Sequence, residues 1–333
     1  MRYIQLPADE KRRLSFYLAM EEFVARYLDE PECFFMWQVE PSVIFGRNQL
    51  IENEVNMDYC RRHAIQVYRR KSGGGCVYAD MKNVMFSYVT KERPGEGGFR
   101  QDSNVGFLFN RYLMMIIQML QRLGVDARAS GRNDVLVGNR KVSGNAFYRL
   151  PGCSIVHGTM LYDTDMLNMV GAITPTDAKL LTKGVQSVRQ RVCLLKDYIT
   201  LTLPEFKAFV HDMLCDKDLM LTAADIRRIE EIEQDYLSPE FIYGNNPRYT
   251  VVKHRRIEGV GEFEARIELK NNVIKGVNLV GDYFLIGELD SQLLDKLKNV
   301  PLERKALSFA LPDRIDDVIL NLYKEDFIDL LTL

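Results

Sequence analysis

The sequence predicts an α+β fold, with a mixed β-sheet flanked by helices and then a small C-terminal α+β domain. Several short runs rich in β-branched and aromatic residues follow one amphipathic helix, which is typical of a mixed sheet rather than a doubly wound parallel one. The length of 333 residues suits about two domains. A turn-rich stretch, SPEFIYGNNPRY at 238–249, separates the last helices of the first part from a β-hairpin in the second.

Apolar residues at helical spacing predict the first helix over Ser15–Leu28. Short strands follow, and Pro41 marks the turn between the first two. A Gly/Pro-rich loop at 92–102 precedes a long amphipathic helix from Val105 to Leu123. More strands come next, before short helices and loops over 164–200. The expected strands of this part are 34–39, 42–46, 65–70, 83–90, 125–130, 134–138, 140–150 and 153–162.

Two helices, over 204–215 and 222–237, end the first part, and the second opens with T-A-A-D, a variant of the capping box. Beyond the turn-rich stretch, EFEARIELK and VIKGVNLVG alternate about a Lys-Asn-Asn turn, which predicts a β-hairpin. Helices are expected near 290–298 and 315–323, and the two domains over 1–243 and 248–333.

Composition and charge exclude several classes of function. The 44 basic and 46 acidic residues give a net charge of −2, so no global positive field directs the chain to nucleic acid or to an anionic membrane. Its most apolar helix is interrupted by polar residues, so we expect no membrane span. The six cysteines form no C-x-x-C pair and the four histidines stand apart, which disfavours a zinc site. We expect a reduced, cytoplasmic protein that holds any anion with a local cluster.

The segment RRKSGGGCVYAD at 69–80 contains three successive glycines behind three basic side chains. A backbone without Cβ atoms approaches a ligand closely, and its N–H groups can converge on an oxyanion. An arginine fork from Arg69 or Arg70 can grip a phosphate, and Lys71 adds positive charge. Taken alone, the segment also fits a glycine turn between two strands with solvated charges. The G-x-x-x-x-G-K-[ST] spacing of a P-loop is absent.

A second motif, GRNDVLVGNRKVSGNA, covers 131–146. Its Gly-Asn pair at 138–139 favours a tight hairpin turn, which places Asp134 and Lys141 close together on paired strands. Gly144 lets a ligand lie against the strand, so that Lys141 can point into a cleft as a positive point charge. In isolation, an exposed hairpin lysine and a solvent-facing aspartate fit the same residues.

The remaining candidates leave two interpretations open. His157 shares a strand face with Cys153, and this face lines a pocket or packs in the core. Trp37, the only tryptophan, lies on an apolar strand. Cys76 and Cys153 are candidate acyl-carrying nucleophiles, but the sequence places no base beside either. The basic segment KLLTKGVQSVRQRVC at 179–193 closes over an anionic ligand or is a solvated loop.

Together the motifs resemble the lipoate–protein ligase A family, within a superfamily that also holds biotin ligases and octanoyl transferases. The resemblance covers nearly all of 1–195, whereas the C-terminal domain is similar to the family's accessory domain in size and layout only. It runs in order through FYLAMEE (16–22), W-x-x-x-P-S-V-I-F-G-R-N-Q (37–49), RRKSGGGCVYAD with Asn83, GRNDVLVGNRKVSGNA, HGTML and KGVQSVRQRV.

The resemblance implies a biotin/lipoate ligase-like catalytic domain with a role for each matching residue. Lys141 and Asp134 would be catalytic: Lys141 would contact both the lipoate carboxylate and the α-phosphate, and Asp134 would help place the nucleotide, its Mg²⁺ or the incoming lysine. The KGVQSVRQRV loop, with Lys183 and Gly184, would order over the adenylate. ATP would be bound by Arg70, Gly75, Cys76, Val77, Tyr78, Asn83, Asp134 and Lys141. Lipoate would be bound by Trp37, Arg70, Ser72, Gly74, Gly75, Lys141, Gly144 and His157.

Two positions depart from the family pattern. Ala79 stands where members often have histidine, just before Asp80, so any polar role at that position is in question. Cys76 stands where alanine is frequent, and its expected contribution is its backbone.

The implied function is ATP-dependent ligation. Lipoate would be activated to lipoyl-AMP with ATP and Mg²⁺, without a covalent enzyme intermediate. It would then be transferred to a lysine of lipoyl domains in 2-oxoacid dehydrogenase E2 subunits or of the glycine-cleavage H protein. Octanoate is a second small-molecule candidate, and we expect a monomer. Two rivals stay open: an octanoyl or lipoyl transferase working through a cysteine thioester, and a non-catalytic lipoate- or adenylate-binding module. Biotin ligation fits less well, since the spacing around Lys141 follows the lipoate pattern.

Overall fold

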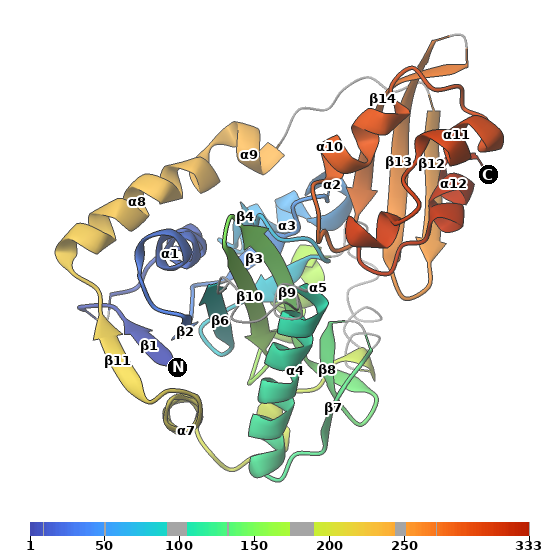
Figure 1. Cartoon of the computed structure of the whole chain (residues 1–333). Helices are drawn as coiled ribbons and strands as arrows, with labels where there is room; N and C mark the ends of the chain where they lie inside the picture. Colours follow the sequence, from blue (N-terminus) through green and yellow to red (C-terminus); the bar gives the residue numbers. More distant parts are fainter. Residues whose placement is uncertain are drawn as a thin grey trace, which may run out of the picture.

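Three β-sheets and their surrounding helices make up the described part of the chain (Figure 1). One sheet has eight strands and the other two have three each. The structure is a computed structural model, and it describes residues 1–8, 10–49, 51–91, 105–131, 133–173, 190–243, 251–270 and 272–332.

The large sheet is mixed, which confirms the predicted fold class. β1 runs parallel to both β11 and β2, whereas β6, β10, β9, β8 and β7 continue the sheet in antiparallel fashion. Across the sheet the strands are β11 (Lys217–Met220), β1 (Arg2–Gln5), β2 (Glu32–Trp37), β6 (Val84–Lys91), β10 (Cys153–Met160), β9 (Arg140–Leu150), β8 (Asp134–Val137) and β7 (Ala127–Ala129).

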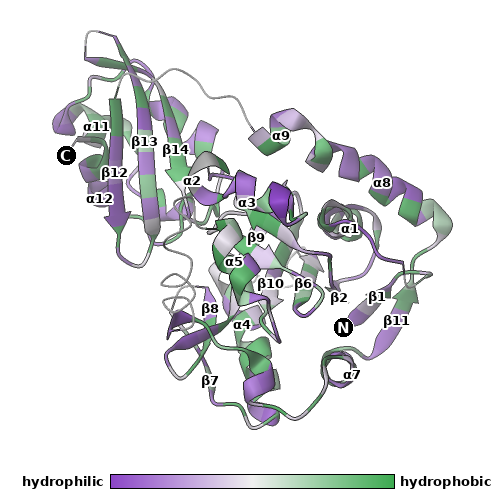
Figure 2. Cartoon of the chain, turned by 180° about the vertical axis from the view of Figure 1, so that it is seen from behind, coloured by the Kyte–Doolittle hydropathy of each residue, from purple (hydrophilic) through white to green (hydrophobic). Residues whose placement is uncertain are grey.

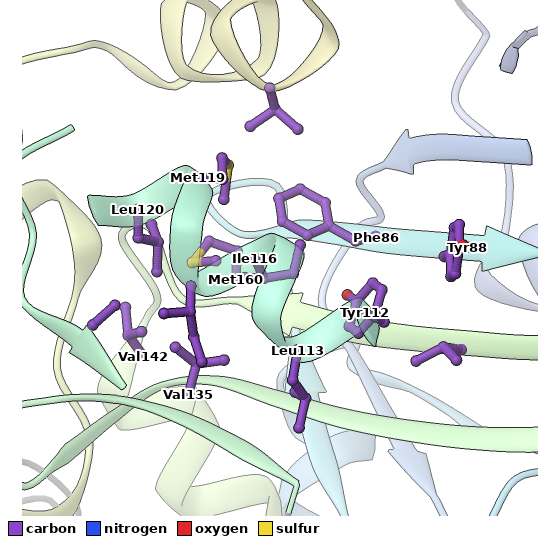
Figure 3. Packing of buried hydrophobic residues seen from close by; sticks show 14 of the residues in the cluster. Phe86, Tyr88, Tyr112, Leu113, Ile116, Met119, Leu120, Val135, Val142 and Met160 are labelled. Atoms are coloured by element: carbon purple, nitrogen blue, oxygen red, sulfur yellow. The ribbon is translucent and has the colours of Figure 1, made fainter. Parts of the chain in front are cut away.

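Each face of this sheet has its own hydrophobic core, because alternate residues of a strand point to opposite sides. On β6, Phe86 and Tyr88 pack beneath α4 (Val105–Arg122), while Met85 and Val89 pack on the opposite face, in the core of α1. Figure 3 shows the first core, where side chains of α4 cover β6 and β10. The sheet is therefore a buried middle layer on which polar groups can be fixed.

Helix α1 (Leu14–Tyr27) covers the second face, and α8 (Ala223–Leu237) packs against α1 (Figure 1). The predicted capping box of α8 is confirmed, with Thr222 and Asp225 bonding each other's backbone N–H. α8 alternates hydrophilic and hydrophobic residues, as expected for a helix with one covered face (Figure 2). The neighbouring elements are η2 (Leu195–Asp197), α7 (Leu203–Leu214) and α9 (Pro239–Tyr243).

A small sheet carries the triple glycine. In it, β3 (Ser42–Phe45) lies between β4 (Gln66–Arg69) and β5 (Val77–Ala79), and residues 70–76 connect β4 to β5. We call residues 71–76 the glycine strip. The sheet shares a core with three short helices, α2 (Ile51–Glu54), α3 (Met57–Arg62) and α5 (Met166–Ile173). The sequence did not predict α2 and α3, whereas α5 lies in the stretch 164–200 where short helices were expected.

The C-terminal part forms a separate core around an antiparallel sheet. The predicted hairpin is confirmed, and Asn272 in its turn has φ of 61°. Strand β12 and two helices were not predicted. The elements are β12 (Val251–Ile257), β13 (Gly261–Lys270), β14 (Val273–Gly281), α10 (Leu289–Gln292), η3 (Leu294–Leu297), α11 (Arg304–Ala310), η4 (Ile315–Asp317) and α12 (Lys324–Thr332).

Two helix predictions in this part need correction. The helix expected near 290–298 is two short ones, because Leu293 between them has a non-helical backbone (φ −128°, ψ −61°). The helix expected near 315–323 is only the 3₁₀ turn η4, since Asn321 takes a left-handed φ of 63° that no α-helix accommodates. The expected domain boundary at 243–248 falls almost wholly outside the described residues. Among those residues, no helix is long and apolar enough to cross a membrane.

Candidate active site

A cavity lies between the glycine strip and strands β9 and β10 of the large sheet. Apolar side chains such as Leu18, Ile44 and Met85 form part of its wall, and a few polar groups converge on it. This combination is typical of a small-molecule site. The predicted site residues that line it are Trp37, Arg70, Gly74, Gly75, Cys76, Val77, Lys141, Gly144 and His157.

Lys141 and Asp134 lie together, as the hairpin predicted. β8 and β9 pair across a turn in which Gly138 has φ of 61°. The Lys141 ammonium is 2.8 Å from a carboxylate oxygen of Asp134, and the lysine side chain is 34% exposed. A Cβ on Gly144 would lie 2.5 Å from Cε and Nζ of Lys141. The lysine therefore lies across the bare backbone of Gly144, with its charge at the cavity wall.

Arg70 shapes the glycine strip from within. Its Nη2 donates to the carbonyl oxygens of Gly73 (2.6 Å) and Gly75 (2.8 Å), and its Nη1 donates to Ile44 (3.1 Å). Burial lowers the pKa of Arg70 to about 10. All three guanidinium nitrogens are engaged once the bond from Nε to Ser72 is added, so Arg70 holds the backbone of the strip in place. Sequence reasoning expected a free arginine fork here.

The two other basic side chains of the motif, Arg69 and Lys71, also bind groups of the protein itself. Arg69 donates to the carbonyl oxygens of Arg47, Gln49 and Ile242. Lys71 pairs with the buried Glu22 at 2.5 Å. The part of the strip that faces open space is Gly75, where a Cβ would meet no atom within 4 Å. The strip therefore offers main chain rather than arginine side chains to a ligand.

A chain of buried hydrogen bonds runs behind the cavity. Ser72 and His157 contact each other, with 2.7 Å between Oγ and Nε2. The other imidazole nitrogen, Nδ1, lies 2.9 Å from a carboxylate oxygen of Glu21. Glu21 also accepts from Ser87 (2.6 Å), which accepts from the Trp37 indole (2.8 Å). The sequence did not lead us to predict Glu21 as a site residue, although it lies in FYLAMEE. The signal that could have found it is an acidic residue on the apolar face of an amphipathic helix.

Four predicted binding residues of the described part do not line the cavity, and one of them is Asp134, which contacts Lys141 from outside the lining. Ser72 is fully buried behind His157. Tyr78 points into the core of α3 and α5, because it alternates on β5 with Val77, which lines the cavity. Asn83 is buried and donates to Thr164 at 3.0 Å. Ala79 is fully buried as well. Lys183 and Gly184 lie outside the described residues.

The two candidate cysteine nucleophiles lack the surroundings that activate a thiol. Burial raises the pKa of the Cys76 thiol, which disfavours the reactive thiolate. The buried Cys153 thiol donates to the carbonyl oxygen of Ala25 at 3.0 Å. Both are free cysteines. Their environments fit packed thiols rather than acyl carriers.

The C-terminal part contacts the glycine strip directly. Gly74 N–H donates to the carbonyl oxygen of Tyr283 at 3.2 Å, and Gly281 N–H donates to Asn48 at 2.8 Å. The Phe284 ring stacks on Phe147 of β9 with centroids 5.8 Å apart. The residues that follow β14 therefore lie against the strip, beside the cavity.

The described residues contain no group of three or more histidine, cysteine, aspartate or glutamate side chains placed to hold a metal ion. Asp134, which the sequence predicted as a site residue, has its carboxylate beside the Lys141 ammonium. A single carboxylate suits Mg²⁺, which is usually held by one or two carboxylates together with substrate phosphates.

Comparison with known proteins identifies the family of the chain. Residues 14–214 match the family described as the lipoyl protein ligase A/B catalytic domain, and residues 246–331 match the bacterial lipoate protein ligase C-terminus. Lipoate-protein ligase LplJ of Bacillus subtilis is 31% identical over 94% of this chain and 95% of its own length. Lipoate–protein ligase 1 of Staphylococcus aureus is 33% identical over 87% of this chain and 89% of its own.

Solved structures show the same fold. The P. falciparum LipL1 structure in complex with lipoate has a TM-score of 0.73 at 20% identity, and covers 99% of this chain and 98% of that one. A bi-partite lipoate protein ligase from Thermoplasma acidophilum has a TM-score of 0.64 at 24% identity, over 75% of this chain and 98% of that one. The chain therefore belongs to the lipoyl protein ligase A/B family, and it carries the C-terminal domain of the bacterial lipoate protein ligases.

Proposed function

We propose that the protein is an ATP-dependent lipoate–protein ligase, which joins lipoate to AMP and then passes the lipoyl group to a lysine of an acceptor protein. The observation that carries this proposal is Lys141, whose ammonium lies across Gly144 beside both the cavity and the glycine strip. Two relatives that span nearly the whole chain bear the name lipoate-protein ligase.

The first half-reaction brings together two anions, the lipoate carboxylate and the α-phosphate of ATP. A carboxylate oxygen attacks the α-phosphorus, the bond to the bridging oxygen breaks, and pyrophosphate leaves. Because the two anions repel each other, the site needs a cation aimed between them. Lys141 supplies this charge, and Asp134 orients its ammonium. Gly75 adds backbone beside the ligand where no side chain intervenes.

In the second half-reaction, the ε-amine of the acceptor lysine attacks the acyl carbon of lipoyl-AMP. AMP leaves with the bonding electrons, the amine loses its proton, and an amide forms. The acceptors that we propose are lipoyl domains of 2-oxoacid dehydrogenase E2 subunits and the glycine-cleavage H protein. One solved relative is described together with its E2 lipoyl domain. We further propose that the enzyme acts as a monomer in the cytoplasm, where its free cysteines stay reduced.

Mg²⁺ is the metal that we propose, with Asp134 as the protein ligand beside the phosphates. When bound, it would neutralise phosphate charge as the pyrophosphate leaves. Octanoate fits the same cavity chemistry as lipoate, since both carry a carboxylate on an apolar chain.

The acyl-transferase alternative is weaker on structural grounds. It needs an activated cysteine, whereas burial raises the pKa of the Cys76 thiol and Cys153 donates to a backbone carbonyl. The matched variants Cys76→Ala and Cys153→Ala test this directly. A ligase keeps ATP-dependent transfer in both variants, and a thioester transferase loses its activity in one of them.

The decisive experiment is pyrophosphate release from ATP with lipoate present and no acceptor. We expect release in a burst that matches the enzyme concentration, with lipoyl-AMP detected by mass spectrometry. Lys141→Ala should abolish both signals, while Arg256→Ala, an exposed arginine in the C-terminal sheet, should leave them unchanged. Near-normal release by Lys141→Ala would reject the assignment of this lysine.

A further inference from the structure

Six buried side chains form one continuous chain of hydrogen bonds from the cavity wall to the glycine strip. In order, they are Trp37, Ser87, Glu21, His157, Ser72 and Arg70. Every link measures 2.6–2.9 Å between donor and acceptor, and none of the six residues is more than 6% exposed. We call this set the Glu21 relay. Glu21 is its only carboxylate, and it touches no part of the cavity itself.

One proton arrangement in this relay gives every side-chain proton between Arg70 and Glu21 an acceptor. Arg70 has only donors, so its Nε–H donates to Ser72 Oγ. The Ser72 hydroxyl proton then goes to His157 Nε2, which must be unprotonated to accept it. Nδ1 therefore carries the imidazole proton and donates it to Glu21, which is an acceptor when ionised. In this arrangement His157 is the neutral Nδ1–H tautomer, and no polar atom of the relay is left without a partner.

Removal of the Glu21 acceptor disturbs the whole arrangement. The buried Nδ1–H of His157 would have no partner, which favours the opposite tautomer with its proton on Nε2. That proton would point at Ser72, which already accepts from Arg70, and the Ser72 hydroxyl proton would lose its acceptor. Arg70 is the side chain that fixes the carbonyl oxygens of Gly73 and Gly75. The disturbance therefore reaches the glycine strip.

We propose that Glu21 is a positioning residue for the ligation reaction. It sets the tautomer of His157 and, through Ser72 and Arg70, holds the glycine strip in the conformation that the reaction needs. This inference rests on the proposed function, because the strip is where the adenylate forms. Glu21 acts without touching either substrate.

Ser72, His157 and Glu21 also match the order of a nucleophile, base and orienting acid. The structure disfavours a nucleophilic role, since Ser72 is fully buried, lies behind His157 and accepts a bond from Arg70. A fluorophosphonate probe should therefore leave Ser72 unlabelled in the intact enzyme. Labelling of this serine would overturn the positioning role.

The first test uses ¹⁵N NMR of the histidine-labelled wild-type enzyme, with His157 assigned by comparison with His157→Gln. We expect the chemical shifts of a neutral Nδ1–H imidazole. A neutral Nε2–H ring or an imidazolium would overturn the proposal, whatever the enzyme catalyses. This measurement needs no destabilised variant.

The second test compares steady-state pyrophosphate release by Glu21→Met and Glu21→Gln, with an acceptor lipoyl domain present so that the enzyme turns over. Methionine has similar length but only a weak sulfur acceptor, so we expect kcat to fall about tenfold or more, with KM for lipoate nearly unchanged. Glutamine keeps an oxygen for Nδ1–H and should restore most of kcat, together with the wild-type tautomer. The matched control is Glu233→Gln, which replaces another buried glutamate that accepts from a serine, Ser15, at 2.5 Å. It should behave as wild type.

The outcomes separate this inference from the proposed function. A rise in KM for lipoate with kcat unchanged in Glu21→Met would mean that Glu21 shapes the acyl pocket, and would refute the positioning role. Equal loss in the methionine and glutamine variants would also refute it. If the wild-type enzyme releases no pyrophosphate with lipoate, the proposed function fails, while the NMR result still decides the tautomer.

Discussion

Replacing Gly144 by alanine tests the placement of Lys141, the proposed catalytic lysine, more finely than deleting the lysine. The new Cβ would lie 2.5 Å from both Cε and Nζ of Lys141. Non-bonded atoms settle at about 3.5–4.0 Å, so the ammonium must move by about 1 Å or more. A misplacement of about 1 Å can reduce a rate by about 10²-fold. We therefore expect Gly144→Ala to lower kcat for lipoyl-AMP formation by about 10²-fold.

Stability should hardly change in this variant. Gly144 is not among the glycines with a positive φ, and the atoms that clash belong to the flexible end of a side chain. Single-turnover pyrophosphate release and thermal unfolding measure the two effects. The control is Gly276→Ala on β14, where the nearest atom to a new Cβ is 3.8 Å away. Wild-type kcat in Gly144→Ala would refute the placement of the ammonium across this glycine, and loss of both kcat and folding would show a different cause.

Three further predictions concern stability. Thr222→Ala removes the capping box of α8 and should cost about 1 kcal/mol in urea unfolding, whereas an unchanged midpoint would exclude a role for the cap. Gly171→Ala in α5 places a Cβ 2.3 Å from a tyrosine ring and should cost about 1–3 kcal/mol by overpacking, which calorimetry can check. Hydrogen bonds to Asp212 and Asp218 raise the pKa of His211 in the folded protein. The contribution of His211 to stability is therefore complete below the unfolded-state pKa of 6.5, and it is lost as pH rises through the folded-state pKa. His211→Gln should therefore flatten the decline in stability above about pH 6.5, and an identical pH profile would contradict this.

The sequence predicted best what depends on neighbours along the chain. The Gly138 turn pairs the strands that carry Asp134 and Lys141, as the sequence predicted. A register shift between Val135 and Leu136, which the sequence did not predict, then sets Asp134 opposite Gly144. The capping box of α8 was predicted for the same reason, since two residues three positions apart, Thr222 and Asp225, make the whole pattern. The alternation of buried residues on β6 likewise follows from the pleat alone.

Other features depended on partners far away in the sequence. Arg69 and Arg70 were expected to face a phosphate, but they bind backbone carbonyls that only the fold brings near. Ser72 was expected at the lipoate, and it lies behind His157 because of the Glu21 relay, whose members span more than 130 residues. Tyr78 belongs to a different core from its neighbour Val77. Short helices such as α3 were missed because their stability comes from tertiary packing.

The central claim is that one ammonium group holds two negatively charged reactants together beside the glycine strip. The most direct measurement is a crystal structure with a non-hydrolysable lipoyl-adenylate analogue. We expect Nζ of Lys141 within about 3 Å of both an acyl oxygen and the group that replaces the phosphate. A Lys141 side chain turned into solvent, with the analogue held by other cations, would contradict the account.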